Sequence, residues 1–452
     1  MKKLQNSVTR GATPPRALLE GRHRHLQISL HPASPTRQYN SPYNTLPTHT
    51  DQLGFLSILM MYTTAMLVLL AALALSEISS KSTGTIVGTN IGGWLVLEPW
   101  ITPSLFYRFL GKTHSSVKTE IGMDSFTFCE ALGPDYGNLV MRQHWDLFFR
   151  EADIKNLAER GIEMVRLPVG DWTLEPYGPY VGCMDGAADK ITWMFDTCAK
   201  YNISVLLEIH AMKDSQNGFD NSGETMELLW NDDTHFSHWP NAQANWLGYW
   251  NVEYQYYENT SWENVDRAVS ISTELIKKWG KHSAFAAFEP VNEPWWNSNL
   301  DVLKSYYRQV REILRQYSPD AKFVFHNAFD YSAESWNDLF PDEDMDNVVM
   351  DHHYYQAWNQ GMNTVEQFCD DYESNAAYAA YIKYDVWFGE WSLATDVCAT
   401  WLGGLNDGNT VPQFTCKYVE CPSTYMEELG TDFDRTVRFP YLLYNPLKTR
   451  FL

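Results

Sequence analysis

The chain of 452 residues lacks the sequence patterns that mark several common ligand sites. It has no glycine-rich phosphate loop of the Walker type, no zinc-finger spacing and no His-Glu-x-x-His motif. Its 13 histidines are scattered along the sequence. The sequence therefore predicts no metal site and no bound cofactor.

Positive charge is also scarce. Lys and Arg together number 34 against 56 Asp and Glu, which gives a formal net charge of -22 and an isoelectric point near 4.9. Because a body of this charge would repel phosphate backbones, the composition disfavours a nucleic-acid partner.

Aromatic side chains, in contrast, are abundant. They make up 15% of the residues and include 18 Trp and 26 Tyr. Flat rings stack on apolar faces of ligands while indole N–H and phenol O–H groups bond polar rims, so this bias suggests sugar recognition. The alternative is that the rings fill a large core, which the hydrophobic content of 44% would also form.

Two segments precede the predicted globular body. Residues 1–52 are rich in Pro, Ser, Thr, His and Arg without apolar periodicity, which indicates a disordered basic tail. Residues 53–76 contain no charged side chain and are long enough to cross a membrane as a helix. The basic tail before this helix would stay in the cytosol, leaving the body outside as a type II anchored protein.

The apolar segment has a second interpretation. A start at Met60 or Met61 would make it the core of a cleaved signal peptide. Both interpretations predict an extracellular or cell-surface location, with membrane anchoring in the first. The sequons at Asn202 and Asn259 agree with that location.

Seven cysteines are compatible with an oxidising compartment, but the sequence leaves their pairing open. One hypothesis pairs Cys398 with Cys416 or Cys421 across a short loop. For Cys129, a buried free thiol is an equally good interpretation.

Apolar runs of strand length recur from residue 85 onward and alternate with helical patterns. The predicted strands are 85–96, 163–168, 204–210, 284–288, 322–325, 348–355 and 385–390, and the clearest helices are 151–160, 265–279 and 303–317. This repetition favours a (β/α)₈ barrel of strands buried on both faces. A doubly wound open sheet is the alternative. The insert at 217–257 is interpreted as an ordered rim loop.

Polar residues collect where these runs end. They are Asn90, Glu98, Arg166, His210, Asn292, Glu293, His353, Tyr355 and Glu390. Two glutamates without metal ligands suit a retaining glycosidase, in which one carboxyl protonates the leaving oxygen and the other attacks the anomeric carbon. Glu390 should be ionised next to Arg166. Glu293 should be protonated, and neutral or apolar neighbours should raise its pKa.

Several of these residues also have purely structural interpretations. Arg166 could form a structural ion pair, His210 could be a satisfied core histidine, and Asn292 could serve only the turn. His353 and Tyr355 could bond the two carboxyl groups. Asn292 could bond the sugar hydroxyl next to the reacting centre.

Six motifs resemble those of the exo-β-1,3-glucanases of glycoside hydrolase family 5. In chain order they are Gly88 to Phe106, Val165 to Gly170, Asp214 to Gly223, Asn292-Glu293-Pro294, Asp351 to Gln356, and Gly389-Glu390-Trp391-Ser392. The resemblance covers about residues 85 to 405. The Ser-Gln-Asn-Gly-Phe-Asp-Asn-Ser-Gly segment is specific to this branch.

The resemblance implies a (β/α)₈ barrel that removes glucose from the ends of β-1,3-glucans with retention. It implies Glu293 as the acid/base and Glu390 as the nucleophile. It assigns substrate binding to Glu98, Arg166, His210, Phe219, Asp220, Asn221, Asn292, His353, Tyr355 and Trp358. Phe219 matches one aromatic of an entrance pair, and Trp358 stands where the second is usually Phe. The partner is then a β-glucan, and the protein is expected to be a monomer.

Three departures from the family pattern qualify this interpretation. His210-Ala211-Met212-Lys213 replaces the usual His-Gly-Ala-Pro, and Trp295-Trp296 adds aromatic surface after Asn-Glu-Pro. Residues 425–452 are an irregular tail without the expected eighth strand, so the barrel domain is assigned to 85–424. Alternative functions are another specificity on the same site (β-1,6-glucanase, endo-glucanase or glucosylceramidase-like) or an inactive glucan-binding wall protein.

Overall fold

The computed structural model describes residues 86–392 apart from 110–121, 225–228, 231–235, 238–243, 252–253, 255, 331, 359–363 and 380. These residues belong to one compact unit, Ser82–Leu452. The segments predicted at 1–52, 53–76 and 425–452 lie outside the described residues. Within the described part, no helix has both the length and the apolar character needed to cross a bilayer.

Seven parallel strands form one sheet in the order β1-β2-β3-β8-β9-β10-β11. They are β1 Gly88–Asn90, β2 Met164–Gly170, β3 Ser204–Ala211, β8 Phe285–Glu289, β9 Lys322–His326, β10 Val348–Tyr354 and β11 Asp385–Trp391. The Asn90 side chain on β1 donates to the Gly389 carbonyl on β11 at 2.8 Å, so the two outer strands approach each other. The sheet is thus a nearly closed barrel, and the predicted α/β barrel class is confirmed.

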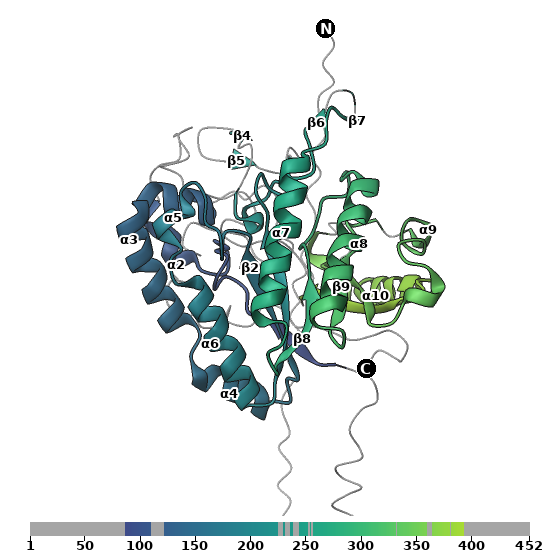
Figure 1. The fold of residues 1–452 in the computed structure, drawn as a ribbon, viewed down its shortest axis with the longest axis horizontal. Helices are drawn as coiled ribbons and strands as arrows, with labels where there is room; N and C mark the ends of the chain where they lie inside the picture. The colour runs from purple at the N-terminus through teal and green to yellow at the C-terminus, as the bar shows by residue number, and fades with distance from the viewer. Residues whose placement is uncertain are drawn as a thin grey trace, which may run out of the picture. The chain divides into compact units, whose positions relative to one another are not determined.

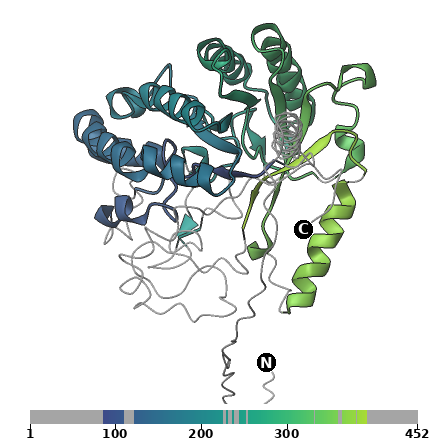
Figure 2. The same cartoon turned by 90° about the horizontal axis from the view of Figure 1, so that it is seen from below.

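Helices cover the outside of this sheet (Figures 1 and 2). The α-helices are α2 Pro103–Phe106, α3 Ser125–Phe148, α4 Glu151–Glu159, α5 Tyr180–Cys183, α6 Ala187–Lys200, α7 Trp262–Trp279, α8 Leu300–Tyr317, α9 Ala333–Trp336 and α10 Val365–Ala379. Short 3₁₀ turns are η1 Tyr107–Phe109, η3 Asp220–Ser222, η4 Asp342–Asp344 and η5 Gln356–Trp358. The described part of the 217–257 insert carries two small antiparallel pairs, β4 Leu229–Trp230 with β5 Phe236–Ser237, and β6 Trp250–Asn251 with β7 Tyr256–Tyr257.

Helix α8 illustrates why these segments are helical. Its buried residues Val302, Leu303, Tyr306, Tyr307, Val310 and Leu314 recur at spacings of three and four, which places them on one face. Asn299 caps the helix by accepting from the Val302 amide. The buried face packs toward β9, where the Tyr307 ring lies 5.7 Å from that of Phe325.

Alternation along the strands builds the barrel interior in layers. One apolar layer consists of Met164, Leu206, Ala287, Val324, Val349 and Trp387. Two residues further along each strand, toward the carboxyl ends, stand Arg166, Glu208, Glu289, His326, Asp351 and Gly389. A buried layer rich in charged side chains therefore lies directly above the apolar one.

An irregularity in β11 turns Glu390 inward. Asp351 pairs with Trp387 and His353 pairs with Glu390, so β11 has one more residue than β10 in this interval. Such a bulge re-aims the side chains that follow it. Gly389 has no side chain at this point, where a Cβ would collide with the Asp351 carboxylate, and its amide donates to Asp351 Oδ1 at 2.6 Å.

The predicted strands agree with those of the structure to within two residues at each end, except for the first strand. The run 85–96 was too long a prediction, since β1 ends at Asn90 and the following residues form a buried turn. Strand β9 extends one residue further than predicted, to His326.

One disulfide, between Cys129 and Cys183, joins α3 to α5. The interpretation of Cys129 as a free thiol was wrong, because its partner comes from a helix 54 residues away in sequence and only folding brings the two together. Cys198 is buried and free. Cys398, Cys416 and Cys421 lie outside the described residues, so their predicted pairing stays a prediction.

Candidate active site

The Asn292-Glu293-Pro294 corner follows β8 at the carboxyl end of the barrel. Glu293 has φ of 42°, in the left-handed region that non-glycine residues seldom occupy. The Asn292 amide donates to the Ile209 carbonyl at 2.9 Å, and Gln216 Nε2 donates to the Asn292 carbonyl at 3.0 Å. Strained backbone held in this way by β3 and the loop that follows it is typical of functional sites.

Arg166 lies at the centre of the polar layer and is completely buried. Its Nη1 is 2.9 Å from Glu390 Oε1, its Nε is 2.9 Å from Glu289 Oε2, and its Nη2 donates to Asn292 Oδ1 at 2.8 Å. Glu208 and Asp351 lie within 3.3 and 3.9 Å of the guanidinium. One cation thus holds the carboxyl groups of several strands at fixed positions.

Glu390 has the cationic neighbour predicted from the sequence. Besides the ion pair with Arg166, its Oε2 accepts from the Tyr355 hydroxyl at 2.8 Å. His353 Nδ1 lies 3.6 Å from the same oxygen. Because both oxygens have polar partners, the carboxylate is held in one orientation.

The neighbours of Glu293 are not those expected for a protonated acid. His353 Nδ1 is 2.8 Å from Oε1, and Asn221 Nδ2 donates to Oε2 at 2.9 Å. Burial would raise the pKa of Glu293, but the hydrogen bond and charge of His353 outweigh it and lower that pKa to about 2. The expectation of neutral or apolar neighbours was wrong, because His353 arrives from β10, 60 residues away in sequence.

His353 stands between several carboxylates. Its Nδ1 faces Glu293, and its Nε2 lies 3.1 Å from Asp351 Oδ2. Burial disfavours its charged form, but Glu390 and Asp351 raise the pKa of His353 well above its usual range. In the unliganded site the proton of the Glu293–His353 hydrogen bond is therefore held on the histidine.

Glu98 and His210 form a second polar group beside the carboxyl pair. Burial raises the pKa of Glu98 to about 7, against the opposing effect of His210 and with a contribution from Glu390. His210 Nδ1 is 2.6 Å from Glu208 Oε1. Burial would lower the pKa of His210, but Glu208 outweighs it and raises that pKa to about 9.

The raised pKa of Glu98 predicts that the affinity for a hydroxyl-bearing substrate depends on pH. The substitution Glu98→Gln should remove this pH dependence. The wild-type carboxyl loses its proton as pH rises from 6 to 8, and a carboxylate accepts hydroxyl hydrogen bonds more strongly than a neutral acid. The KM of the wild type should fall over this range, while the variant should show a flat KM about 10-fold higher at pH 8. Steady-state kinetics at fixed ionic strength test this. Parallel KM profiles would contradict it.

Aromatic rings form a wall next to Glu293. Phe219 lies edge-to-face with Trp295 at 4.9 Å, and Trp295 lies edge-to-face with Phe329 at 5.6 Å. All three rings are half-buried. The Trp358 side chain, the second predicted entrance aromatic, lies outside the described part of the structure.

Asp220 begins the η3 turn and is buried. Burial raises its pKa well above the usual range, and the charges of Asp124 and Glu98 act in the same direction.

The sequence inventory missed four interior residues: Glu208, Glu289, His326 and Asp351. Each is a polar residue in an apolar strand, two positions after a member of the apolar layer. This spacing of two residues, which keeps a side chain on the same face of a strand, is the sequence pattern that would have identified them. Glu289 is buried, which raises its pKa well above the usual range even though it contacts Arg166.

Several buried polar atoms of the site have no hydrogen-bond partner among the described residues. They include His210 Nε2, Asn292 Nδ2 and His326 Nε2. Because buried donors are normally paired, these atoms are suited to a ligand rich in hydroxyl groups.

Two groups of side chains have atoms within 4.8 Å of one another, as metal ligands do. They are Glu293 with His326 and His353, and Glu289 with Asp351 and His353. In both, His353 already has a carboxylate at each nitrogen. These contacts account for the clusters without a metal ion.

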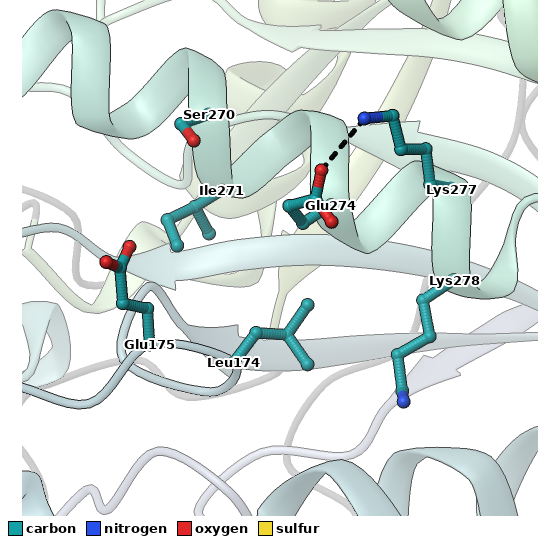
Figure 3. A pocket seen from close by; sticks show the side chains of 7 residues that line it. All are labelled: Leu174, Glu175, Ser270, Ile271, Glu274, Lys277 and Lys278. Carbon is teal, nitrogen blue, oxygen red and sulfur yellow. Dashed lines mark hydrogen bonds and ion pairs between the residues drawn. The ribbon is translucent and has the colours of Figure 1, made fainter.

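A separate hollow of about 540 Å³ lies between α7 and the loop after β2. Figure 3 shows Leu174 and Glu175 on one side and Ile271, Glu274 and the neighbouring residues of α7 on the other. None of the predicted site residues lines it, so it is distinct from the candidate active site.

Comparisons with known proteins identify relatives and a shared fold. The family model for cellulase, glycosyl hydrolase family 5, matches residues 136–405. The glucan 1,3-beta-glucosidase of Lachancea kluyveri is 32% identical over 341 residues, which cover 72% of this chain and 69% of that protein. The glucan 1,3-beta-glucosidase of Pichia angusta is 30% identical over 335 residues, which cover 72% of this chain and 67% of that protein. The crystal structure of rutinosidase from Aspergillus niger shares the fold, with a TM-score of 0.52 at 21% identity over 69% of this chain and 81% of that one.

Proposed function

The chain belongs to glycosyl hydrolase family 5, and we propose that it is a retaining exo-β-1,3-glucanase that releases glucose from the ends of β-1,3-glucans. The observation that carries this proposal is the pair Glu293 and Glu390, whose carboxyl groups face the same nitrogen of His353 at 2.8 and 3.6 Å. Such proximity favours the carboxyl separation of about 5 to 5.5 Å in retaining enzymes over the about 6.5 to 9.5 Å of inverting ones.

In this mechanism Glu390 attacks the anomeric carbon while Glu293 protonates the leaving oxygen. Arg166 and Tyr355 bond the Glu390 oxygens and orient the nucleophile. Asn292 offers its free Nδ2 to the adjacent sugar hydroxyl while Arg166 holds its Oδ1. Water then hydrolyses the glucosyl-enzyme, with Glu293 as the base.

The catalytic proton starts on His353 and needs to move only along the hydrogen bond to Glu293. Glu390 is the charge that most strongly favours protonated His353. When Glu390 becomes bonded to the sugar, its charge disappears and the pKa of His353 falls. The attack thereby drives the proton toward Glu293 and the leaving oxygen.

The preference for terminal β-1,3-linked glucose is supported by the names of the relatives, which are 30 to 32% identical. Glu98 and His210 add polar groups suited to the hydroxyls of a terminal sugar. The aromatic wall on the Glu293 side supplies apolar surface for the leaving chain.

Product analysis tests this proposal. The purified full chain is incubated with laminarin, pustulan and glucosylceramide, and early products are followed by chromatography and proton NMR. Glucose should be the only early product from laminarin and should appear first as the β anomer. Early oligosaccharides would indicate endo cleavage, and an initial α anomer would contradict retention.

We also propose that the protein acts outside the cell or at its surface, as a monomer. The Cys129–Cys183 disulfide is of the kind that persists in oxidising compartments. Asn202 and Asn259, the two sequon asparagines, are exposed. A loss of mass on endoglycosidase treatment of the natively expressed protein would support this location, and unmodified asparagines with a reduced cysteine pair would oppose it.

A further inference from the structure

His326 is a buried side chain of the site that the proposed mechanism leaves without a role. It ends β9 and stands in the polar layer, two residues after Val324 of the apolar layer, so it points into the barrel. One of its ring nitrogens belongs to the group of atoms from Glu293, His326 and His353 that lie within 4.8 Å of one another. Its ring meets that of His353 edge-to-face at 4.5 Å.

The backbone after β9 determines which ring nitrogen carries the proton. The Ala328 amide donates to His326 Nδ1 at 3.0 Å, so Nδ1 is an acceptor and the hydrogen resides on Nε2. The turn that makes this contact is left-handed, with φ of 51° at Ala328 and 53° at Phe329. Asn327 secures the turn by accepting from the Phe329 amide at 3.1 Å.

His326 is therefore a neutral donor with an unused N–H. Its ring is fully buried, and Nε2 has no partner among the described residues. The charged groups that face it are Glu293, Asp351, His353 and Arg166, and burial together with His353 lowers the pKa of His326 well below its usual range. A metal ion on Nε2 would have to displace the only ring hydrogen while Nδ1 stays occupied by the amide, so a hydroxyl acceptor fits this nitrogen better.

The His326 ring lies on the leaving-group side of the proposed site. Glu293, which delivers the proton to the leaving oxygen in the proposed mechanism, belongs to the same cluster of atoms. The Phe329 ring packs 5.0 Å from His326 and connects it to Trp295 in the aromatic wall. A sugar lying against this wall would bring its hydroxyl groups to the base of the wall.

We propose that His326 binds the leaving glucosyl unit by donating its Nε2–H to a hydroxyl oxygen of that sugar. This rests on the proposed glycosidase function and extends it to the recognition of the leaving group. The Ala328 amide serves this role by holding the histidine in the one tautomer that can donate.

The test compares two substrates that differ only in the leaving group. The variant His326→Phe keeps an aromatic ring against His353 but lacks the donor. Its kcat/KM for laminaribiose, divided by that for methyl β-glucoside, should fall about 10-fold relative to wild type, because the methoxy leaving group needs the same proton from Glu293 but has no hydroxyl to bond. His326→Gln, which retains an N–H donor, should recover part of this ratio.

A matched control is available at the opposite end of the barrel. His282 also accepts the amide two residues ahead, from Ala284 at 3.2 Å, and packs against Phe195. His282→Phe should leave the ratio unchanged.

The ratio of the two kcat/KM values could also stay unchanged in both His326 variants, even if both values fall. That result would show that His326 has a purely structural role, and it would overturn the proposal. Inactivation of the wild type by EDTA would overturn it in favour of a metal ligand. If the wild type cleaves gentiobiose or cellobiose but not laminaribiose, the proposed specificity fails, and the ratio is measured on the disaccharide that is cleaved.

Discussion

Replacement of Glu390 by alanine is expected to lower the rate of glucose release from laminarin by about 10⁵-fold or more, the scale typical of removing a nucleophile. The carboxylate is held by Arg166 and Tyr355 at 2.9 and 2.8 Å, and no other described carboxyl has this pair of partners. Without it, no covalent intermediate can form. The residual rate is measured by initial glucose release at a series of enzyme concentrations.

Azide separates the role of Glu390 from that of Glu293. In Glu390→Ala, azide can occupy the vacated space and attack 2,4-dinitrophenyl β-glucoside directly, which inverts the anomeric centre and yields the α-glucosyl azide. In Glu293→Ala, azide attacks the glucosyl-enzyme instead and yields the β product. Glu373→Ala, an exposed glutamate on α10, serves as the control and should retain wild-type activity. A β azide from Glu390→Ala would exclude it as the nucleophile.

Replacement of Arg166 by methionine should destabilise the fold by about 3–5 kcal/mol, because it leaves buried carboxylates without their cation. Arg166 contacts Glu289 and Glu390 at 2.9 Å each and Glu208 at 3.3 Å, and all of these side chains are buried. Their mutual repulsion in a medium of low polarity would then be unopposed. Urea denaturation of the two proteins measures the difference in free energy of unfolding.

Arg315 provides the matched control for this prediction. It too forms two ion pairs, with Glu312 at 3.4 Å and Asp344 at 2.8 Å, but its side chain is 53% exposed. Arg315→Met should therefore lower stability by about 1 kcal/mol or less. Equal losses in the two variants would contradict a central role for Arg166. Arg166→Lys should recover only part of the stability, since an ammonium group cannot reproduce the several directed bonds of the guanidinium.

The fold could be predicted from the sequence to a large extent. The apolar runs that form β2, β3 and β8 to β11 end within a few residues of the predicted positions, because strands buried on both faces leave a local signal. The error at 85–96 came from residues such as Ile91 and Trp94, which are buried in a turn rather than in a strand. Burial alone does not distinguish these two conformations.

The site was predictable as a list of residues but not as a set of contacts. The motifs and strand ends identified Glu293, Glu390, Arg166 and His353. The inward turn of Glu390 depends on a bulge between β10 and β11, which only the pairing of the two strands reveals. Of the missed residues, Glu208 and Asp351 lie within strands, whereas Glu289 and His326 are the last residues of β8 and β9. Only the register of the sheet shows that all four belong to one inward-facing layer.

By itself, the sequence determined the alternation of strands and helices, the two catalytic carboxyl candidates and the aromatic character of the site. These features depend on short segments of the chain, each of which has its own apolar pattern or motif. The tertiary structure decided the contact between His353 and Glu293, the Cys129–Cys183 bridge and the charged layer around Arg166. These depend on distances between groups far apart in sequence, and both electrostatic energy and disulfide formation are functions of distance in space. The Asn292-Glu293-Pro294 corner was thus identifiable from its sequence, whereas the histidine that bonds the Glu293 carboxyl comes from another strand.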